Sequence, residues 1–339
     1  NFNSGWLLRL GLAEGAEAPD YDDHAWQRVT LPRAWNEAEA FRRPIHQLSD
    51  TTMWYRKHFR LRAVAGRKFF VEFEGVRFGA EVYVNGHRLG LTENGVMASG
   101  WDLTPYVHEG ENVIAVWVDS SWRYHERSSG SPYQWNDRNF NANYGGIPKN
   151  VWLHETDRLY QTLPLYSNLR TTGVYIYGTD YDIAGHAVTL HAESQVRNDD
   201  DRPRSFTYRC EVADKDGRTV ARFGGRRVTM QPGETCNVAA EGRLTGAHFW
   251  SWGYGYLYTV TTRLMDDDGM PMDDHVVRTG FRKTRFAEGR IWLNDRIIMM
   301  HGYAQRTSNE WPGVGMSVPA WLSDYSNRLQ VESGGNLVR

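Results

Sequence analysis

Cysteine is nearly absent from this 339-residue chain, which contains only Cys210 and Cys236. Two thiols cannot build a disulfide-stapled scaffold or a four-thiolate zinc site. No run approaches the roughly 18 apolar residues that a membrane-spanning helix needs, so a membrane span is excluded for the sequence shown. An excess of positive charge is also missing, because 39 Lys and Arg residues face 41 Asp and Glu residues. Without a basic field, a nucleic-acid partner is disfavoured.

A targeting signal is missing as well. The chain opens at Asn1 without a Met and without a basic segment followed by an apolar one, which suggests a processed or trimmed N-terminus. The two cysteines do not fix the redox compartment. The localisation is therefore left open, with a bacterial periplasmic or secreted location favoured over the cytoplasm.

Aromatic residues are abundant. The chain has 14 Trp, 18 Tyr and 13 Phe, so that Trp outnumbers the 12 Pro. Tryptophan suits strand-rich cores and packs against flat apolar ligand surfaces such as the faces of sugar rings. The composition therefore favours a protein rich in β-strands with a carbohydrate as its partner.

Short alternating runs separated by turn residues fill the chain from about residue 53 to residue 155, a pattern typical of all-β domains. Residues 80–84 run into Asn85-Gly86, the strongest short hairpin signal. Further strands are expected at 54–61, 69–73, 113–118 and 151–154. The polar segment 119–150 is long for a connection in a compact β domain, and such segments more often have a function than serve only as a connection.

A second β region follows a linker expected at 159–168. Its strands are predicted at 174–177, 188–192, 206–212 and 256–260. About 115 residues with roughly seven short strands match the size of an immunoglobulin-like sandwich. Both cysteines fall on its predicted strands, where buried and unreactive thiols are the default.

The pattern changes after Phe281. Residues 290–300 predict a hairpin on Asn294-Asp295 whose second arm, continuously apolar, is expected to be buried on both faces. A helix is predicted from Ala320 to Glu332 after Pro319, and Gly334-Gly335 should end it before another strand at 336–339. Strand, helix and strand in this order open a parallel α/β unit. The helix should present an apolar face made of Trp321, Leu322, Tyr325 and Leu329.

Four motifs together resemble glycoside hydrolase family 2, the group of β-galactosidases, β-glucuronidases and β-mannosidases. Residues 54–56 (WYR) with 84–90 (VNGHRLG), and 143–151 (NYGGIPKNV), are similar to the family's sugar-binding jelly roll. Residues 249–258 (FWSWGYGYLY) are similar to a signature of its immunoglobulin-like domain. Residues 280–282 (GFR), 292–294 (WLN) and 301–302 (HG) are similar to the entry into its catalytic barrel. The order of the motifs along the chain is that of the family.

The resemblance implies a mostly β chain in three parts: a jelly-roll sugar-binding domain at 1–162, an immunoglobulin-like β-sandwich at 163–282, and the start of a (β/α)8 TIM barrel at 283–339. It implies the N-terminal part of a retaining exo-β-glycosidase, most similar to β-galactosidases, that releases terminal sugars from oligo- or polysaccharides. The alternative is a non-catalytic carbohydrate-binding protein. The choice among galactoside, glucuronide and mannoside is left open.

No catalytic carboxylate is assigned, because the family carries both glutamates on later barrel strands and only 57 residues (339 − 282) follow Arg282. Arg339 ends the predicted second barrel strand, where the resemblance implies an arginine that supports the nucleophile. The alternative is a solvated arginine at a strand end. His301, Arg306 and Trp311 are expected at the top of the first barrel strand, where they could line the sugar pocket, although a lone His is more often structural.

The Asn-rich loop in the first domain is the other candidate for sugar contact. Asp137, Asn139 and Asn141 could hydrogen-bond to hydroxyl groups, because the family's jelly roll reaches the barrel mouth; the alternative is a loop held by its own Asx turns. The acidic runs 199–201 and 266–268 lack the ligand spacing of an EF-hand and are interpreted as hairpin turns. No metal and no cofactor is assigned, and a cation in the full enzyme is left open.

The expected partners are therefore a carbohydrate substrate and the remainder of the chain's own barrel. A homo-oligomer is left open.

Overall fold

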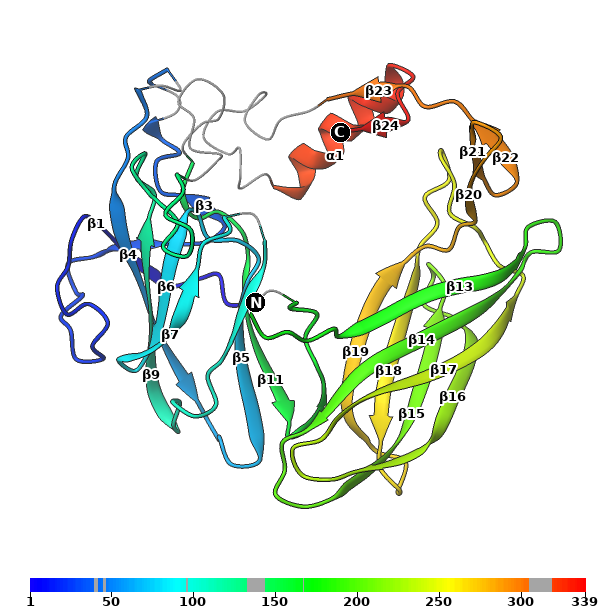
Figure 1. The fold of residues 1–339 in the computed structure, drawn as a ribbon, viewed down its shortest axis with the longest axis horizontal. Coiled ribbons are helices and arrows are strands. Elements are labelled where there is room, and N and C mark those ends of the chain that lie inside the picture. Colours follow the sequence, from blue (N-terminus) through cyan, green and yellow to red (C-terminus); the bar gives the residue numbers. More distant parts are fainter. Residues whose placement is uncertain (40–41, 45–46, 96, 133–143, 167, 305–318) are drawn as a thin grey trace.

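A computed structural model of the chain describes residues 1–39, 42–44, 47–95, 97–132, 144–166, 168–304 and 319–339. It contains two β-sandwiches, followed by a small hairpin and a strand–helix–strand unit (Figure 1). Within these ranges, no helix combines the length and the apolar character that crossing a membrane requires. The prediction of a mostly β chain is confirmed.

The first sandwich packs a six-stranded sheet, in the order β2-β1-β4-β9-β6-β7, against a three-stranded sheet, β11-β5-β8, while β3 pairs with β10. Trp6, Phe69 and Phe73 are fully buried between the layers. The arrangement is consistent with the expected jelly roll. The strands are β1 (Trp6–Leu10), β2 (Gln27–Val29), β3 (Arg33–Ala34), β4 (Thr52–Leu61), β5 (Arg67–Phe73), β6 (Gly79–Val84), β7 (His87–Thr92), β8 (Ser99–Asp102), β9 (Gly110–Asp119), β10 (Gly146–Ile147) and β11 (Val151–Asp157).

The hairpin predicted at Asn85-Gly86 joins β6 to β7. Both turn residues have positive φ, +47° and +82°, as a two-residue hairpin turn of type I′ requires. The Asn85 side chain also accepts a hydrogen bond from the backbone N–H of Val113 at 2.8 Å and donates one to Asn112 Oδ1 at 2.8 Å. The turn residue thereby ties the hairpin to β9.

The first residues of the chain close the first sandwich. The Phe2 N–H donates to the Val151 carbonyl at 2.8 Å, and the Val151 N–H donates to Asn3 Oδ1 at 2.8 Å. Asn3 Nδ2 donates to Asn150 Oδ1 at 2.9 Å. The start of the chain is thus hydrogen-bonded to the start of β11, the last strand of this domain.

A buried arginine fixes the segment between β1 and β2. Arg56 of β4 is fully buried, and its Nε donates to Asp23 Oδ2 at 2.7 Å while its Nη1 donates to the carbonyls of Ala16 and Ala18. His58 Nε2 lies 2.9 Å from the same Asp23 oxygen. Burial alone would raise the pKa of Asp23, but the hydrogen bonds from Arg56 and His58 outweigh it and leave the pKa lowered.

The second sandwich also has two layers. One holds β14 with β13 and β12 on one edge and β17 on the other, and the second holds β16-β15-β18-β19. Phe206, Tyr208 and Val260 are fully buried between them, consistent with the expected immunoglobulin-like sandwich. Its strands are β12 (Leu159–Gln161), β13 (Val174–Asp182), β14 (Ala187–Asn198), β15 (Arg204–Ala213), β16 (Thr219–Met230), β17 (Thr235–Thr245), β18 (Tyr258–Met265) and β19 (Pro271–Thr279).

Part of the expected linker at 159–168 is a strand, because β12 pairs with the end of β14. A buried polar group accounts for this. Gln161 Oε1 accepts hydrogen bonds from Ser194 Oγ and Thr262 Oγ1, at 2.9 and 2.6 Å, and its backbone N–H donates to Asp273 Oδ2 at 2.8 Å. These partners lie on β14, β18 and β19, so Gln161 connects both layers of the sandwich.

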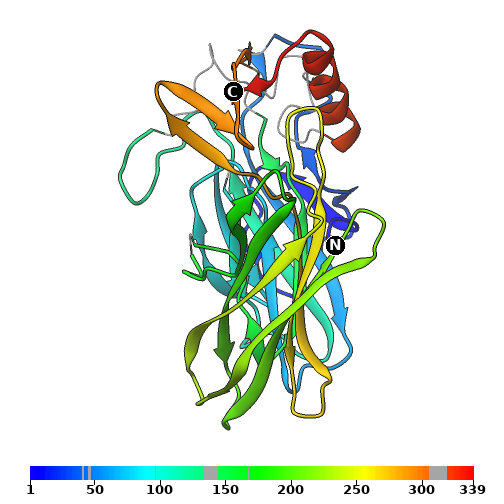
Figure 2. The same ribbon diagram turned by 90° about the vertical axis from the view of Figure 1, so that its right-hand side faces the viewer.

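After the second sandwich, the hairpin predicted on Asn294-Asp295 is present, formed by β21 (Arg290–Leu293) and β22 (Arg296–Ile298), with β20 (Thr284–Ala287) beside β21. The expectation that its second arm is buried on both faces is wrong for this chain, because no layer of the described residues covers it and Met299 is 74% exposed. Figure 2 shows this hairpin and the helix at the same end of the molecule.

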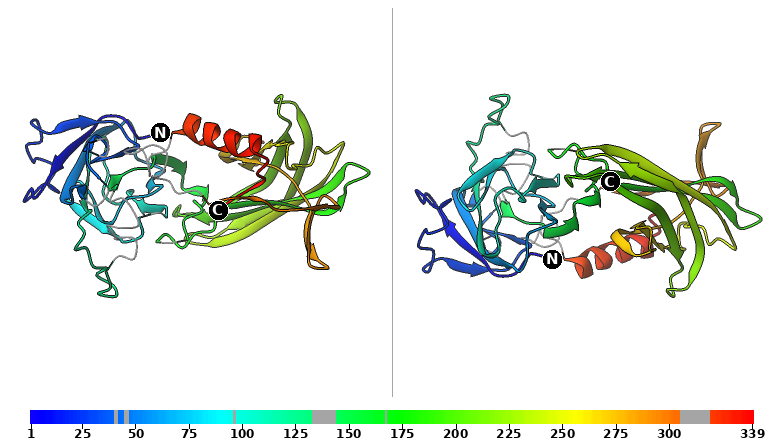
Figure 3. Two further views of the ribbon diagram at one scale, coloured as in Figure 1. Left: turned by 90° about the horizontal axis from the view of Figure 1, so that it is seen from above. Right: turned by 90° about the horizontal axis from the view of Figure 1, so that it is seen from below.

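The helix forms as the sequence predicts, as α1 (Ala320–Glu332), and Gly334 with φ +85° follows its end. It connects β23 (Gly302–Tyr303) to β24 (Leu337–Val338), which pair in parallel. Viewed from above, α1 lies over the region between the two sandwiches (Figure 3). Of its predicted apolar face only Leu322 is buried. One parallel pair is not a closed barrel, so the TIM barrel stays a prediction.

We expect Arg56→Met to lower the free energy of unfolding of the first sandwich by about 3–5 kcal/mol, because it leaves the Asp23 carboxylate buried without its main partner. Urea unfolding followed by circular dichroism measures the change. Arg60→Met, at an exposed position of the same strand, is the matched control and should change stability by less than about 0.5 kcal/mol. Equal effects of the two substitutions would contradict this role of Arg56.

Burial raises the pKa of Asp273 to about 6 from 3.8, although hydrogen bonds from Gln161 oppose the shift. Between these two pH values the folded chain binds a proton that the unfolded chain lacks, so the Asp273 contribution to stability falls as the pH rises from about 4 to 6. Asp273→Asn keeps an acceptor without the charge. It should match the parent near pH 4 and exceed its stability by about 1–3 kcal/mol at pH 8.

Thermal unfolding of parent and variant across pH 4–8 tests this. His275 on the same strand, whose pKa is lowered by burial and by His154, is common to both proteins and largely cancels in the difference. Asp268→Asn, at an exposed turn, is the control. A constant difference between the Asp273 variant and the parent from pH 4 to pH 8 would refute the assignment.

Candidate functional site

The parallel strand–helix–strand unit carries Arg339 at its carboxyl edge. Tyr303 ends β23 and Arg339 follows β24, and the Arg339 N–H donates to the Tyr303 carbonyl at 2.9 Å. The Arg339 side chain is exposed. In parallel α/β sheets, ligand sites gather at the carboxyl ends of the strands. The structure therefore places Arg339 at the edge where the sequence predicts it, while its contact with a sugar stays a prediction.

His301 lies at the opposite edge, which corrects the expectation that it sits at the top of the first barrel strand. It precedes β23, and its backbone N–H donates to Asn336 Oδ1 at 3.0 Å while its carbonyl accepts from the Asn336 N–H at 2.8 Å. Asn336 Nδ2 donates to the Met299 carbonyl at 2.8 Å. Because Asn336 holds the chain before the strand begins, His301 and Arg339 are not brought to the same edge.

Five of the predicted sugar contacts cannot be placed. They lie outside the described residues, and their roles stay predictions: Asp137, Asn139, Asn141, Arg306 and Trp311.

The described start of the long polar segment, residues 119–132, is anchored on the six-stranded sheet. The Tyr124 hydroxyl and the Arg127 N–H both donate to Glu93 Oε1, at 2.5 and 2.6 Å. The Arg127 guanidinium pairs with Glu81 and lies 5.4 Å from the centre of the Trp117 ring. Burial would raise the pKa of Glu93, but these hydrogen bonds leave it lowered. The segment is thus fixed to the sheet on the N-terminal side of the predicted sugar-contacting residues.

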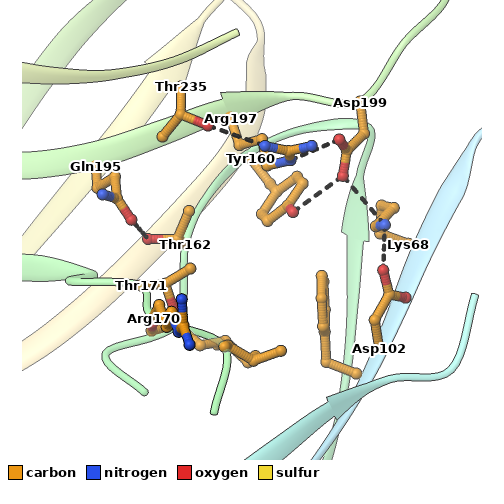
Figure 4. Close-up of a pocket in the computed structure, with 13 residues that line it drawn as sticks. Lys68, Asp102, Tyr160, Thr162, Arg170, Thr171, Gln195, Arg197, Asp199 and Thr235 are labelled. Atoms are coloured by element: carbon orange, nitrogen blue, oxygen red, sulfur yellow. Dashed lines mark hydrogen bonds and ion pairs between the residues drawn. The ribbon is translucent and has the colours of Figure 1, made fainter. Parts of the chain in front are cut away.

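A pocket of about 350 Å³ lies where the two sandwiches meet (Figure 4). On one side, Lys68 Nζ lies 2.5 Å from Asp102 Oδ2, within the first sandwich, and 3.1 Å from Asp199 Oδ2, which follows β14 of the second. Arg197 Nε donates to Asp199 Oδ1 at 2.6 Å, and the Tyr160 hydroxyl donates to Asp199 Oδ2 at 3.1 Å. Two cations and two carboxylates therefore join the domains in a neutral cluster.

Asp199 is charged within this cluster. Burial would raise its pKa, but Lys68 and Arg197 outweigh that effect and hold the pKa below its ordinary value. The same residue begins the acidic run 199–201, in which Asp200 pairs with Arg204 at 2.6 Å. In the other run, Asp267 pairs with Arg227 at 2.7 Å. These ion pairs agree with the interpretation of both runs as structural turns.

Sequence reasoning missed this pocket. Its charged residues belong to no motif, and they come from strands of different domains. The acidic run 199–201 is the only sequence feature at this site, and it does not predict that Asp199 pairs with Lys68. Both cysteines lie on the second sandwich and are free thiols, and burial raises the pKa of Cys210 to about 12, as expected for an unreactive thiol.

Comparison with known proteins identifies both sandwiches. Residues 36–153 match the model of the glycosyl hydrolase 2 galactose-binding domain-like family, and residues 174–282 match the model of glycosyl hydrolases family 2. A β-glucuronidase of Formosa agariphila is 33% identical over the whole chain, which spans 35% of that relative. A β-galactosidase of Bacteroides ovatus is 28% identical over 89% of the chain, which spans 34% of that relative.

Solved structures agree. The structure of a β-glucuronidase from glycoside hydrolase family 2 is similar to this chain with a TM-score of 0.91 and 32% identity, over 100% of this chain and 36% of that one. A family 2 member from Bacteroides cellulosilyticus has a TM-score of 0.83 and 25% identity, over 100% of this chain and 44% of that one. The chain thus spans only a part of these relatives. It belongs to glycoside hydrolase family 2 and carries the N-terminal domains of that family.

Proposed function

We propose that this chain is the N-terminal part of a retaining exo-β-glycosidase that removes a terminal sugar from an oligo- or polysaccharide. The observation that carries the proposal is the order of its parts: two sandwiches that match family 2 models, followed by a parallel strand–helix–strand unit. A protein that only binds carbohydrate has no need of such a unit, which is why the non-catalytic alternative ranks second.

Exposed apolar side chains support a larger catalytic domain around this unit. Trp321 and Tyr325 on α1 are 60% and 43% exposed, and Tyr303, Leu337 and Val338 on the two strands are 45–56% exposed. Several exposed apolar side chains on one small unit are typical of an interface. We assign this surface to further strand–helix units of the same barrel.

The chemistry requires two carboxyl groups about 5–5.5 Å apart, one as acid/base and one as nucleophile. We assign neither to this chain. Glu332 lies on α1, exposed and 3.6 Å from Arg328, as expected for a surface ion pair, and Glu310 lies outside the described residues. What this chain would supply is the Arg339 guanidinium at the carboxyl edge, where it would hold the nucleophilic carboxylate in its charged form.

A β-glucuronide is the substrate class we favour. The relative from Formosa agariphila, named a β-glucuronidase, shares more identity with this chain than the β-galactosidase from Bacteroides ovatus does. β-Galactosides are the second candidate, since several relatives carry that name. The sequence alone favoured a β-galactosidase, and the relatives do not separate the two activities.

A protein in which this chain is continued by a complete barrel should hydrolyse 4-nitrophenyl β-D-glucuronide with net retention, because the family chemistry passes through two displacements. Proton NMR of the first-formed sugar reports the anomer, and absorbance reports kcat/KM. The 339-residue chain alone should release no nitrophenol. Net inversion, or turnover by this chain alone, would overturn the proposal. A higher kcat/KM on the β-galactoside would select the second candidate.

In that longer protein, Arg339→Ala should lower kcat about 100-fold to 1,000-fold, because it removes a charged donor beside the reacting groups. Arg226→Ala, at an exposed position of β16, is the matched control and should leave kcat within about twofold of the parent. Initial rates on the aryl glycoside measure both. An unchanged kcat in the Arg339 variant would show that this arginine is only a solvated strand end.

A further inference from the structure

The pocket between the sandwiches is separate from the edge that carries Arg339. None of its lining residues belongs to β23, α1 or β24. Its volume of about 350 Å³ lies at the lower end of the range for ligand pockets, roughly 300–1,000 Å³, and domain boundaries are preferred positions for such sites. It is lined by Lys68, Phe70, Asp102, Tyr160, Thr162, Leu163, Leu169, Arg170, Thr171, Gln195, Arg197, Asp199 and Thr235.

The acidic groups of this pocket are already compensated. Asp102 is paired with Lys68, and Asp199 with Lys68 and Arg197 (Figure 4). Arg170 is a further cation in the lining, so the formal charge of the lining is +1. A ligand in this pocket therefore meets an excess of positive charge.

Arg170 and Gln195 carry donor groups without a partner among the described residues. The Arg170 guanidinium has no acceptor within the part of the chain that the structure describes, and its backbone has a positive φ of +56°. Gln195 Oε1 accepts from Thr162 Oγ1 at 2.9 Å and from the Thr172 N–H at 3.1 Å. These two bonds fix the orientation of the Gln195 amide, and no acceptor among the described residues takes its Nε2 group. The pocket thus offers donors to a ligand rich in acceptors.

Apolar side chains complete the lining. These are Phe70, Leu163 and Leu169, and the Phe70 ring lies 5.5 Å from the Tyr160 ring, centre to centre. Apolar side chains together with hydrogen-bond donors suit a sugar ring, which has an apolar face and a rim of hydroxyl groups. A planar guanidinium suits a carboxylate, because it can donate two parallel hydrogen bonds to it.

We propose that the pocket between the two sandwiches binds a uronic acid residue of an acidic carbohydrate, with Arg170 on the carboxylate, Gln195 Nε2 on a hydroxyl group and the Phe70 side of the pocket against the ring. This is a second carbohydrate site, remote from the carboxyl edge of β23 and β24. It requires no catalysis and goes beyond the proposed function.

Calorimetric titration of the 339-residue chain with methyl β-D-glucuronide and methyl β-D-glucoside tests the site. The two sugars differ only at C6, which is a carboxylate in the glucuronide and a hydroxymethyl group in the glucoside. The glucuronide should bind at least tenfold more tightly. Arg170→Asn should weaken glucuronide binding at least tenfold and remove the preference, because Asn tolerates the left-handed backbone but carries no charge. Arg170→Lys should restore part of it. Arg226→Asn, an exposed arginine of β16, is the control and should bind like the parent.

Several results would overturn the proposal. These are no binding of the glucuronide, equal binding of both sugars, or unchanged binding by Arg170→Asn with a parental melting temperature. Sodium acetate that competes as well as the glucuronide would show a simple anion site instead of a sugar site. Because the readout is binding and not hydrolysis, failure here leaves the proposed glycosidase function standing, and failure of that function leaves this site standing.

Discussion

The Lys68 ammonium group lies at the contact between the two sandwiches. Lys68 of β5 lies between Asp102 of the first sandwich and Asp199 of the second, and Arg197 balances the remaining charge. Because Lys68 is 9% exposed, water cannot take over the role of either carboxylate, and a buried charge without its partner is costly. The neutral cluster exists only where β5 meets the end of β14. This contact helps to set the relative placement of the domains, and with it the pocket between them, together with the ion pair between Arg204 and Asp157 and the apolar cluster around Phe70.

Local patterns carried most of the fold that the sequence could predict. The hairpins at Asn85-Gly86 and Asn294-Asp295 and the helix at 320–332 follow from residues a few positions apart, whose turn and capping preferences act within the segment. The sequence did not predict strands β16 and β19, because their outward positions hold many charged residues and the alternation is obscured. The sequence also did not predict the short strand β12. Its Gln161 is polar, and its burial depends on hydrogen-bond partners on three other strands.

The candidate sites also differ in how far local sequence patterns could predict them. Arg339 could be placed from the strand–helix–strand pattern alone, since a parallel pair fixes which edge the strand ends share. His301 could not, because the amide of Asn336 decides where β23 begins. The pocket between the sandwiches depends on residues far apart in the sequence, such as Lys68 and Asp199, and no spacing rule connects them. Family resemblance did not help there either, since its motifs lie elsewhere.

The hydrogen bond between Asn3 and Val151 has a consequence for synthesis of the chain. Asn3 and Val151 are 148 residues apart in the sequence, so the first sandwich cannot complete its sheets until the ribosome has released both. Until then, the edge that β11 will occupy on β5 has no partner, and other extended chains can pair with it.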